Sequence, residues 1–231
     1  MNPVIQLDKV NLARGAFRLD VPSFSAQPGR VIGLVGRNGA GKTTLLQVIA
    51  GLLRPDAGSV RVCGVCPFGD VVPARQQLAY MTDTQTVLPL PIGALTQALA
   101  AFYPSWDQAL AERLLPRFEL SPDRNPRQLS KGEGTRLRLV LAMAYKPTVL
   151  LLDEPSTGLD VVYRRAMLES VLEVVRDPSR TVIVSSHDVA DLERIADHVV
   201  VMKEGRIVAD APIDELVTDG RSLEQLLVEG A

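Results

Sequence analysis

The chain has 231 residues and a formal net charge of −2, from 25 Lys or Arg residues and 27 Asp or Glu residues. This balance lacks the clustered basic excess that is typical of nucleic-acid-binding proteins, so we expect no nucleic-acid partner. No uninterrupted apolar run approaches the roughly 20 residues of a membrane helix, and the N-terminus does not resemble a secretion signal. We therefore expect a cytoplasmic protein that can bury a substantial core.

The first motif is a glycine-rich loop between a predicted strand at 31–35 and a predicted helix that starts near Lys42 and stops at Gly51. It follows the pattern G-x-x-x-x-G-K-[ST] of a phosphate-binding loop. A glycine-rich turn can be purely structural, but here every fixed position of the pattern is filled. We assign to ATP binding the nine residues Gly36, Arg37, Asn38, Gly39, Ala40, Gly41, Lys42, Thr43 and Thr44.

The residue types of this loop suit a nucleoside triphosphate. Glycines let the backbone N–H groups approach the phosphates closely, and the helix N-terminus adds unpaired N–H groups and a partial positive charge. We expect Lys42 to reach the β- and γ-phosphates and Thr43 to bind Mg²⁺.

The chain around this loop is predicted to be mostly strands, with short strands in 4–35, a strand pair in 59–67 and a further strand in 75–82. Cys63 and Cys66 have the C-x-x-C spacing of a redox or metal pair. No second pair and no nearby histidine completes a zinc site, and their segment is predicted to be a strand that runs into a tight turn. We therefore interpret the two cysteines as structural.

From about 84 to 146 the pattern changes to helical periodicity, which predicts an inserted helical lobe. An apolar run at 148–152 then has no polar alternation, as expected of a parallel strand that is buried on both faces. The other predicted elements are a helix at 161–176, a strand at 181–185, a helix at 189–196, a hairpin across 199–209, and short helical segments near 212–218 and 222–228.

Two carboxylates, Asp153 and Glu154, end the apolar strand. An aspartate beside the phosphate loop can hold Mg²⁺, and Glu154 can take a proton from the attacking water as general base. The alternative is a pair of solvated carboxylates, but charges at the end of a buried strand need partners. His187 follows another predicted strand and would reach the same sheet edge, near the γ-phosphate. A lone histidine is nonetheless more often structural.

The segment 129–133 precedes a long helical run and has two compatible interpretations. In one, Ser130 accepts a hydrogen bond from the Glu133 N–H while the Glu133 side chain reaches back, which is a capping box. In the other, this helix end is a second phosphate-binding site.

Taken together, these motifs resemble the ATP-binding subunit of ABC transporters over essentially the whole chain. Residues 36–44 look like Walker A, 129–133 like the signature motif, 149–154 like Walker B, 157–160 like the D-loop, and His187 like the switch histidine. The resemblance implies an α/β fold of the ABC cassette type, a P-loop NTPase with a mainly parallel core sheet, an antiparallel β subdomain and an inserted α-helical subdomain.

The same resemblance implies a single domain over 1–231, with the core and β subdomain in 1–83 and 147–231 and the helical subdomain in 84–146. In that family two subunits face each other head to tail, and each ATP lies between Walker A of one and the signature of the other. The implied partners are a second copy or a homologous cassette and a separate integral membrane permease, which would place the chain at the inner face of the cell membrane.

The resemblance also implies ATP and Mg²⁺ as cofactors and assigns roles to particular residues. The catalytic residues would be Glu154, His187 and Lys42, the metal-binding residues Thr43, Asp153 and Asp83, and the residues in contact with the partner's ATP Ser130, Lys131, Gly132 and Glu133.

Several positions depart from the family pattern. Lys131 and Glu133 stand where glycine and glutamine are commonest in the signature, and Asp83 stands where a glutamine is usual. An ionised Asp83 could bind Mg²⁺ but cannot donate a hydrogen bond as an amide does. The usual aromatic that stacks on adenine is also missing, and either Arg14 or Phe17 could replace it.

We therefore expect an ATPase subunit that powers transport by a separate membrane-spanning protein. The segments 102–107 and 222–227 look similar to cassettes of bacterial ABC-2-type exporters, which favours export. One alternative is a soluble ABC-type ATPase without a membrane partner. Another is a regulatory subunit that binds ATP with little turnover, for which Asp83 and Lys131 give a reason.

Overall fold

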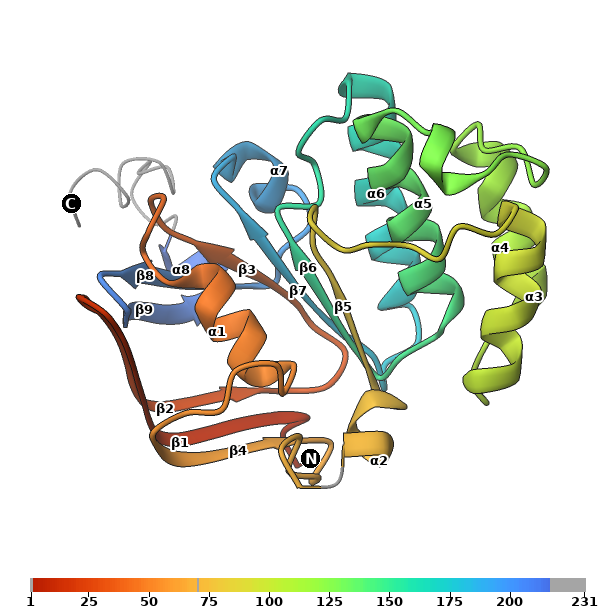
Figure 1. Cartoon of the computed structure of the whole chain (residues 1–231). Helices are drawn as coiled ribbons and strands as arrows, with labels where there is room; N and C mark the ends of the chain where they lie inside the picture. Colours follow the sequence, from red (N-terminus) through yellow and green to blue (C-terminus); the bar gives the residue numbers. More distant parts are fainter. Residues whose placement is uncertain (1, 70, 217–231) are drawn as a thin grey trace.

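The computed structural model describes residues 2–69 and 71–216, and one twisted sheet runs through them (Figure 1). Within these residues the sheet has nine strands in the order β4-β1-β2-β9-β8-β3-β7-β6-β5. The strands are β1 (Ile5–Arg14), β2 (Phe17–Ala26), β3 (Val31–Val35), β4 (Ala57–Val62), β5 (Leu78–Met81), β6 (Val149–Asp153), β7 (Thr181–Ser186), β8 (His198–Lys203) and β9 (Arg206–Pro212). The helices are α1 (Lys42–Ile49), α2 (Val71–Arg75), α3 (Ile92–Phe102), α4 (Gln108–Arg117), the 3₁₀ turn η1 (Pro126–Gln128), α5 (Lys131–Ala144), α6 (Val161–Val174), α7 (Val189–Glu193) and α8 (Ile213–Leu216).

The centre of the sheet is parallel, as the apolar runs predict. β3 pairs with β7 and β8, and β6 pairs with β7 and β5, all in parallel register. Every residue of β3, β6 and β7 is buried, because helices or the second layer of strands cover both faces of these strands. The parallel register brings the carboxyl ends of β3, β6 and β7 to one edge of the sheet.

Alternate residues of the central strands enter two separate cores. On β3, Val31 and Val35 pack among the helices, whereas Ile32 and Leu34 pack beside α1. Figure 1 shows α1 between the antiparallel strands β1, β2 and β4 and the central strands, with α5 and α6 on the other face. Helix α1, which begins at the phosphate loop, therefore lies between two groups of strands.

The strands β1, β2 and β4 form one antiparallel part of the sheet, with β1 paired to β2 and to β4, and β8 and β9 form a second antiparallel pair. The pairing of β1 with β4 is interrupted between Asp8 and Asn11. At this bulge a Cβ on Gly58 would lie 2.3 Å from the Lys9 carbonyl oxygen, so only glycine allows the two backbones to approach.

The expected strand pair in 59–67 is wrong in part. Only β4 forms a full strand there, and it pairs with β1, while Cys63 (φ 50°) and Gly64 (φ 79°) turn the chain back to a single bridge between Val62 and Val65. Both cysteines are free thiols, and burial raises the pKa of the Cys63 thiol. These observations agree with a structural turn.

Between β5 and β6 the described chain is helical, as the periodicity predicts. Buried Leu114, Phe118 and Leu137 join these helices to the core beside β6. The boundaries at 84 and 146 stay a prediction, and the expected helix near 222–228 and the exporter-like tail at 222–227 lie outside the described residues. Helix α2 was not expected from the sequence pattern.

None of the helices in 2–69 and 71–216 combines the length and apolar character that crossing a membrane requires.

Candidate nucleotide-binding site

The loop between β3 and α1 folds tightly against β8. A Cβ on Gly36 would lie 2.5 Å from the Met202 carbonyl oxygen, and a Cβ on Gly41 would lie 2.8 Å from the tip of the Phe17 ring. Gly41, with φ 105°, is also the N-cap of α1 and gives it no side-chain cap. The first N–H groups of α1 therefore have no side-chain acceptor at the cap and suit a bound phosphate.

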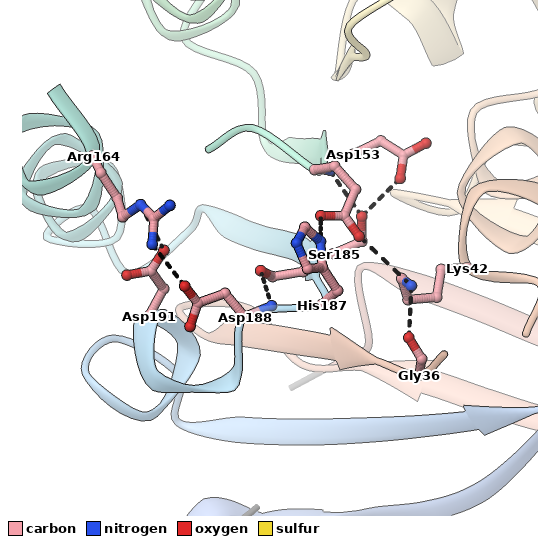
Figure 2. Close-up of polar contacts among 10 residues, drawn as sticks. Gly36, Lys42, Asp153, Arg164, Ser185, His187, Asp188 and Asp191 are labelled. Atoms are coloured by element: carbon pink, nitrogen blue, oxygen red, sulfur yellow. Dashed lines mark hydrogen bonds and ion pairs between the residues drawn. The ribbon is translucent and has the colours of Figure 1, made fainter. Parts of the chain in front are cut away.

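Lys42 lies buried beneath this loop, with 6% of its surface exposed. Its Nζ donates a hydrogen bond to the Gly36 carbonyl oxygen at 2.7 Å (Figure 2). The same Nζ lies 3.6 Å from Glu154 Oε1. The predicted cation, Lys42, and the predicted general base, Glu154, are thus neighbours in space, although they are 112 positions apart in the sequence.

Glu154 and His187 meet at the end of β6 and β7. His187 Nδ1 lies 2.7 Å from Glu154 Oε2. Glu154 has the left-handed backbone angle φ 50°, which a non-glycine residue rarely adopts, and its N–H donates to Ser185 Oγ at 3.0 Å and to the Ser185 carbonyl oxygen at 3.2 Å. These bonds hold the strained turn that aims the carboxylate at Lys42 and His187.

Asp153 is buried beside Glu154, and a hydroxyl donates to each of its oxygens. Ser185 Oγ donates to Oδ1 at 2.7 Å, and Tyr80 Oη donates to Oδ2 at 3.0 Å. Burial, followed by the charge of Asp153, raises the pKa of Tyr80, so its hydroxyl stays protonated. Sequence reasoning missed both donors. The pairing of Asp153 opposite Ser185 would have pointed to one of them.

The residues present fit a Mg²⁺ ion that is shared with phosphate. Thr43 is exposed in the first turn of α1, and Asp153 supplies a carboxylate at the sheet edge. Residues 2–69 and 71–216 contain no cluster of three or more His, Cys, Asp or Glu side chains that could hold a metal alone. Mg²⁺ commonly takes one or two protein oxygens and completes its shell with phosphate oxygens and water.

Asp83, the third predicted metal residue, faces α5. Its Oδ2 lies 3.9 Å from Lys131 Nζ, and its charge also acts on Arg138. The two residues that depart most from the family pattern thus form an ion pair within one chain, and a metal-binding role for Asp83 stays a prediction.

The predicted capping box at the start of α5 is present. Ser130 Oγ accepts from the Glu133 N–H at 3.3 Å, and Glu133 Oε2 accepts from the Ser130 N–H at 2.8 Å. These bonds, together with an ion pair to Arg124, lower the pKa of Glu133 to about 2. Gly132 has a structural reason as well, because its Cβ would lie 2.8 Å from the Gly158 carbonyl oxygen.

A further ion pair joins α6 to the segment after His187. Arg164 lies 2.6 Å from Asp188 Oδ2 and 3.6 Å from Asp191 Oδ2 (Figure 2). Burial raises the pKa of Asp191. The Asp188 N–H also donates to Ser186 Oγ. Sequence reasoning missed Arg164, since no local pattern relates a helix surface to a strand end.

Arg14 and Phe17 face each other at the end of the β1–β2 hairpin. Phe17 is half-buried against Gly41, whereas Arg14 is exposed. Of the two candidates for adenine stacking, Phe17 is the one that touches the phosphate loop.

Comparisons with known proteins agree with this arrangement. Residues 19–157 match the protein-family model described as ABC transporter. The chain is 37% identical over 234 residues to the molybdenum import ATP-binding protein ModC of Mycobacterium tuberculosis H37Rv, covering 89% of this chain and 59% of that protein. It is 30% identical over 195 residues to the ABC transporter ATP-binding protein YtrB of Bacillus subtilis, covering 84% and 66%. It is 33% identical over 198 residues to the Nod factor export ATP-binding protein I of Burkholderia pseudomallei, covering 83% and 65%. The chain thus spans about 60% of the length of the first of these relatives.

Two solved structures have the same fold. An ATP-binding subunit of an ABC transporter superimposes with a TM-score of 0.87 at 28% identity, over 98% of both chains. The cbiO1 protein of Clostridium perfringens superimposes with a TM-score of 0.77 at 20% identity, over 99% of this chain and 94% of that one, which bears on the fold alone. The fold class predicted from the sequence is confirmed. The chain belongs to the ABC transporter family and forms its ATP-binding domain.

Proposed function

We propose that this chain hydrolyses ATP with Mg²⁺, as one half of a head-to-tail dimer, and powers transport by a separate membrane-spanning subunit. The observation that carries the proposal is the chain of contacts from Lys42 to Glu154 to His187 beside the buried carboxylate of Asp153. A cation, a general base and a metal-binding group lie at one sheet edge, where α/β proteins bind ligands.

The contacts suggest how the residues act in turn. A triphosphate in the loop offers Lys42 more acceptor charge than the Gly36 carbonyl oxygen does, so Lys42 would move to the phosphates and free Glu154 Oε1. That oxygen would take a proton from the attacking water while His187 holds Oε2. Bound Mg²⁺ would neutralise phosphate charge, and Thr43 and Asp153 are the residues that would hold it.

The surface around α5 supports a dimer. Ser130 and Lys131 are exposed at the start of α5, next to Gly158. Val161 and Val162 follow Gly158 closely and are 82% and 73% exposed, which is unusual for neighbouring apolar side chains. A second copy, or a homologous cassette, would cover these valines. In that dimer Ser130, Lys131, Gly132 and Glu133 of this chain would contact the ATP bound to the phosphate loop of the partner subunit.

A cavity in the structure is consistent with the proposed membrane-spanning partner. It has a volume of about 520 Å³ and runs along the edge strand β5 between the end of α1 and the helices α3 and α5. Leu88 and Leu52 line it and are 58% and 53% exposed. We propose that an apolar segment of the permease fills it, which would place the chain at the inner face of the membrane. Co-purification from solubilised membranes tests this, and recovery of the chain without any membrane protein would contradict it.

The relatives differ in transport direction. ModC is named for import and the Nod factor protein for export, at 37% and 33% identity. We therefore propose ATP-driven transport without a direction, and export stays a prediction from the sequence.

The substitution Glu154→Gln tests hydrolysis. It keeps the side-chain shape but removes the base, so the ATPase rate should fall at least about 100-fold while MgATP binding and ATP-dependent dimer formation persist. The control is Glu112→Gln on the exposed face of α4, which should keep the wild-type rate. Normal turnover by Glu154→Gln would remove Glu154 from its proposed role.

Mixing two inactive variants tests the shared site. Lys42→Ala destroys the phosphate loop of one subunit, and Ser130→Ala weakens the signature of the other. A mixed dimer has one site built from an intact loop and an intact signature, so activity should reappear on mixing. Activity that never exceeds the sum of the separate variants would argue against a composite site.

A further inference from the structure

We propose that Tyr80 is a positioning residue that, together with Ser185, fixes the Asp153 carboxylate for Mg²⁺ binding. The inference rests on the proposed function, because it concerns the metal of that same site. It begins from the two hydroxyl donors, Ser185 Oγ at 2.7 Å from Oδ1 and Tyr80 Oη at 3.0 Å from Oδ2.

The register of the sheet explains why Tyr80 reaches Asp153. Tyr80 pairs with Leu151, which lies two residues before Asp153 on the neighbouring strand. Two residues of strand correspond to about 6.6 Å, a distance that a phenol side chain can span but a serine or threonine cannot. Because side chains alternate, Tyr80, Leu151 and Asp153 all face α1 and the phosphate loop.

The burial of Asp153 gives the two donors their importance. Asp153 is 5% exposed, so hydrogen bonds from the protein, rather than bulk water, must stabilise its carboxylate. With one donor on each oxygen, rotation of the carboxylate is restricted and its remaining lone pairs keep one direction. Hydrogen bonds that orient a metal-binding group in this way are typically worth 10- to 100-fold in metal affinity.

Tyr80 also lines the cavity described above. It belongs to the edge strand β5, along which this cavity runs. The hydroxyl therefore lies on Asp153 while part of the same side chain borders the cavity. The substitution Tyr80→Phe removes the hydrogen bond to Asp153 but keeps the ring that lines the cavity, so it separates the effects of these two contacts.

The experiment measures how nucleotide binding depends on Mg²⁺ in the full chain. For Tyr80→Phe we expect the Mg²⁺ concentration that gives half-maximal stimulation of ATP binding to rise about 10-fold or more. Binding of ATP in EDTA should be unchanged, because the hydroxyl contacts the metal-binding carboxylate and not the phosphate loop. The control is Tyr103→Phe, since Tyr103 lines the same cavity and packs on Tyr145.

The outcomes separate this inference from the proposed function. A wild-type chain without Mg²⁺-dependent ATP binding would overturn the proposed function itself. A wild-type chain with that dependence, together with a Tyr80→Phe variant that shares it and differs only in melting temperature, would overturn the positioning role.

Fluorine NMR keeps the test decisive if Tyr80→Phe does not fold. The chain contains four tyrosines, so fluorotyrosine labelling gives few resonances, and Tyr→Phe variants of the other three assign Tyr80 by elimination. The Tyr80 resonance should shift when Mg²⁺ is added to the ADP complex. An unchanged Tyr80 resonance would contradict the inference.

Discussion

The first turns of α1 and α5 are both candidate phosphate sites, but they differ in how their N–H groups are satisfied. α1 starts after Gly41, which provides no side-chain cap, and its first turn contains no acidic residue. α5 starts after Ser130 with a complete capping box, and Glu133 brings a negative charge into its first turn.

This difference indicates that the two helix ends cannot bind phosphate equally in the free subunit. The α1 end has donors without a side-chain partner and Lys42 beneath them, so a phosphate completes it. The α5 end already satisfies its cap, and the Glu133 carboxylate in its first turn is held by the Ser130 N–H and by Arg124. We therefore expect the α5 end to contribute only when a second subunit presents a bound triphosphate.

The largest effect should come from Lys42→Ala at the α1 end. The substitution removes the cation from the loop and leaves the Glu154 carboxylate with His187 alone, so MgATP affinity should fall about 100-fold, or roughly 3 kcal/mol. Arg37 is exposed in the same loop, so the fold-change in MgATP affinity caused by Arg37→Ala should be less than a tenth of that caused by Lys42→Ala. Titration with a fluorescent ATP analogue measures both, and equal losses would contradict a special role for the buried amine.

A pair of glycine substitutions should have the next largest effect. Gly132→Ala places a Cβ 2.8 Å from the Gly158 carbonyl oxygen and should lower the free energy of unfolding by about 1–3 kcal/mol. Gly134→Ala meets only the flexible end of Arg138 at 3.4 Å and should raise it by up to about 1 kcal/mol. Urea unfolding compares the two variants. Equal stability would mean that the close approach of the loop at Gly158 does not constrain α5.

The acid in the α5 cap should make part of the stability depend on pH. The pKa of Glu133 is about 2 in the folded chain and 4.5 ordinarily, so its ionised form stabilises the fold above pH 4.5. This contribution is lost as the pH falls from 4.5 towards 2. Glu133→Gln should therefore destabilise the chain by about 1 kcal/mol at pH 7 and by less near pH 3. Urea unfolding at the two pH values is the measurement, and a difference that grows in acid would have the wrong sign.

The sequence predicts the parts of the site that neighbouring residues determine. The glycine pattern of the loop, the buried strand that ends in Asp153 and the Ser130 capping box each depend on a few consecutive residues, and the structure has each of them. The contacts of Tyr80, Ser185 and Arg164 depend on strand register and helix packing across more than 20 residues, so no local pattern predicts them.

The same reason explains the errors in the fold. β4 pairs with β1, which lies about fifty residues earlier, and the turn at Cys63 looks locally like the middle of a hairpin. α2 begins with Val71 and Val72, whose branched side chains favour strands, and its sequence alone gives no reason for a helix. Tertiary packing decides both elements.

The smallest effect should come from the ion pair between Asp83 and Lys131, which joins the segment after β5 to the start of α5. The side chains are 39% and 67% exposed and 3.9 Å apart, so a double-mutant cycle with Asp83→Asn and Lys131→Gln should give a coupling below about 1 kcal/mol. The coupling should vanish in about 1 M salt, where exposed charges are screened within about 3 Å. If Asp83→Asn alone weakened Mg²⁺-dependent ATP binding as much as a change at Asp153, Asp83 would act as a metal residue. The Asp83–Lys131 pair would then link the start of α5 to the metal site beside the start of α1, and it would be more than a surface contact.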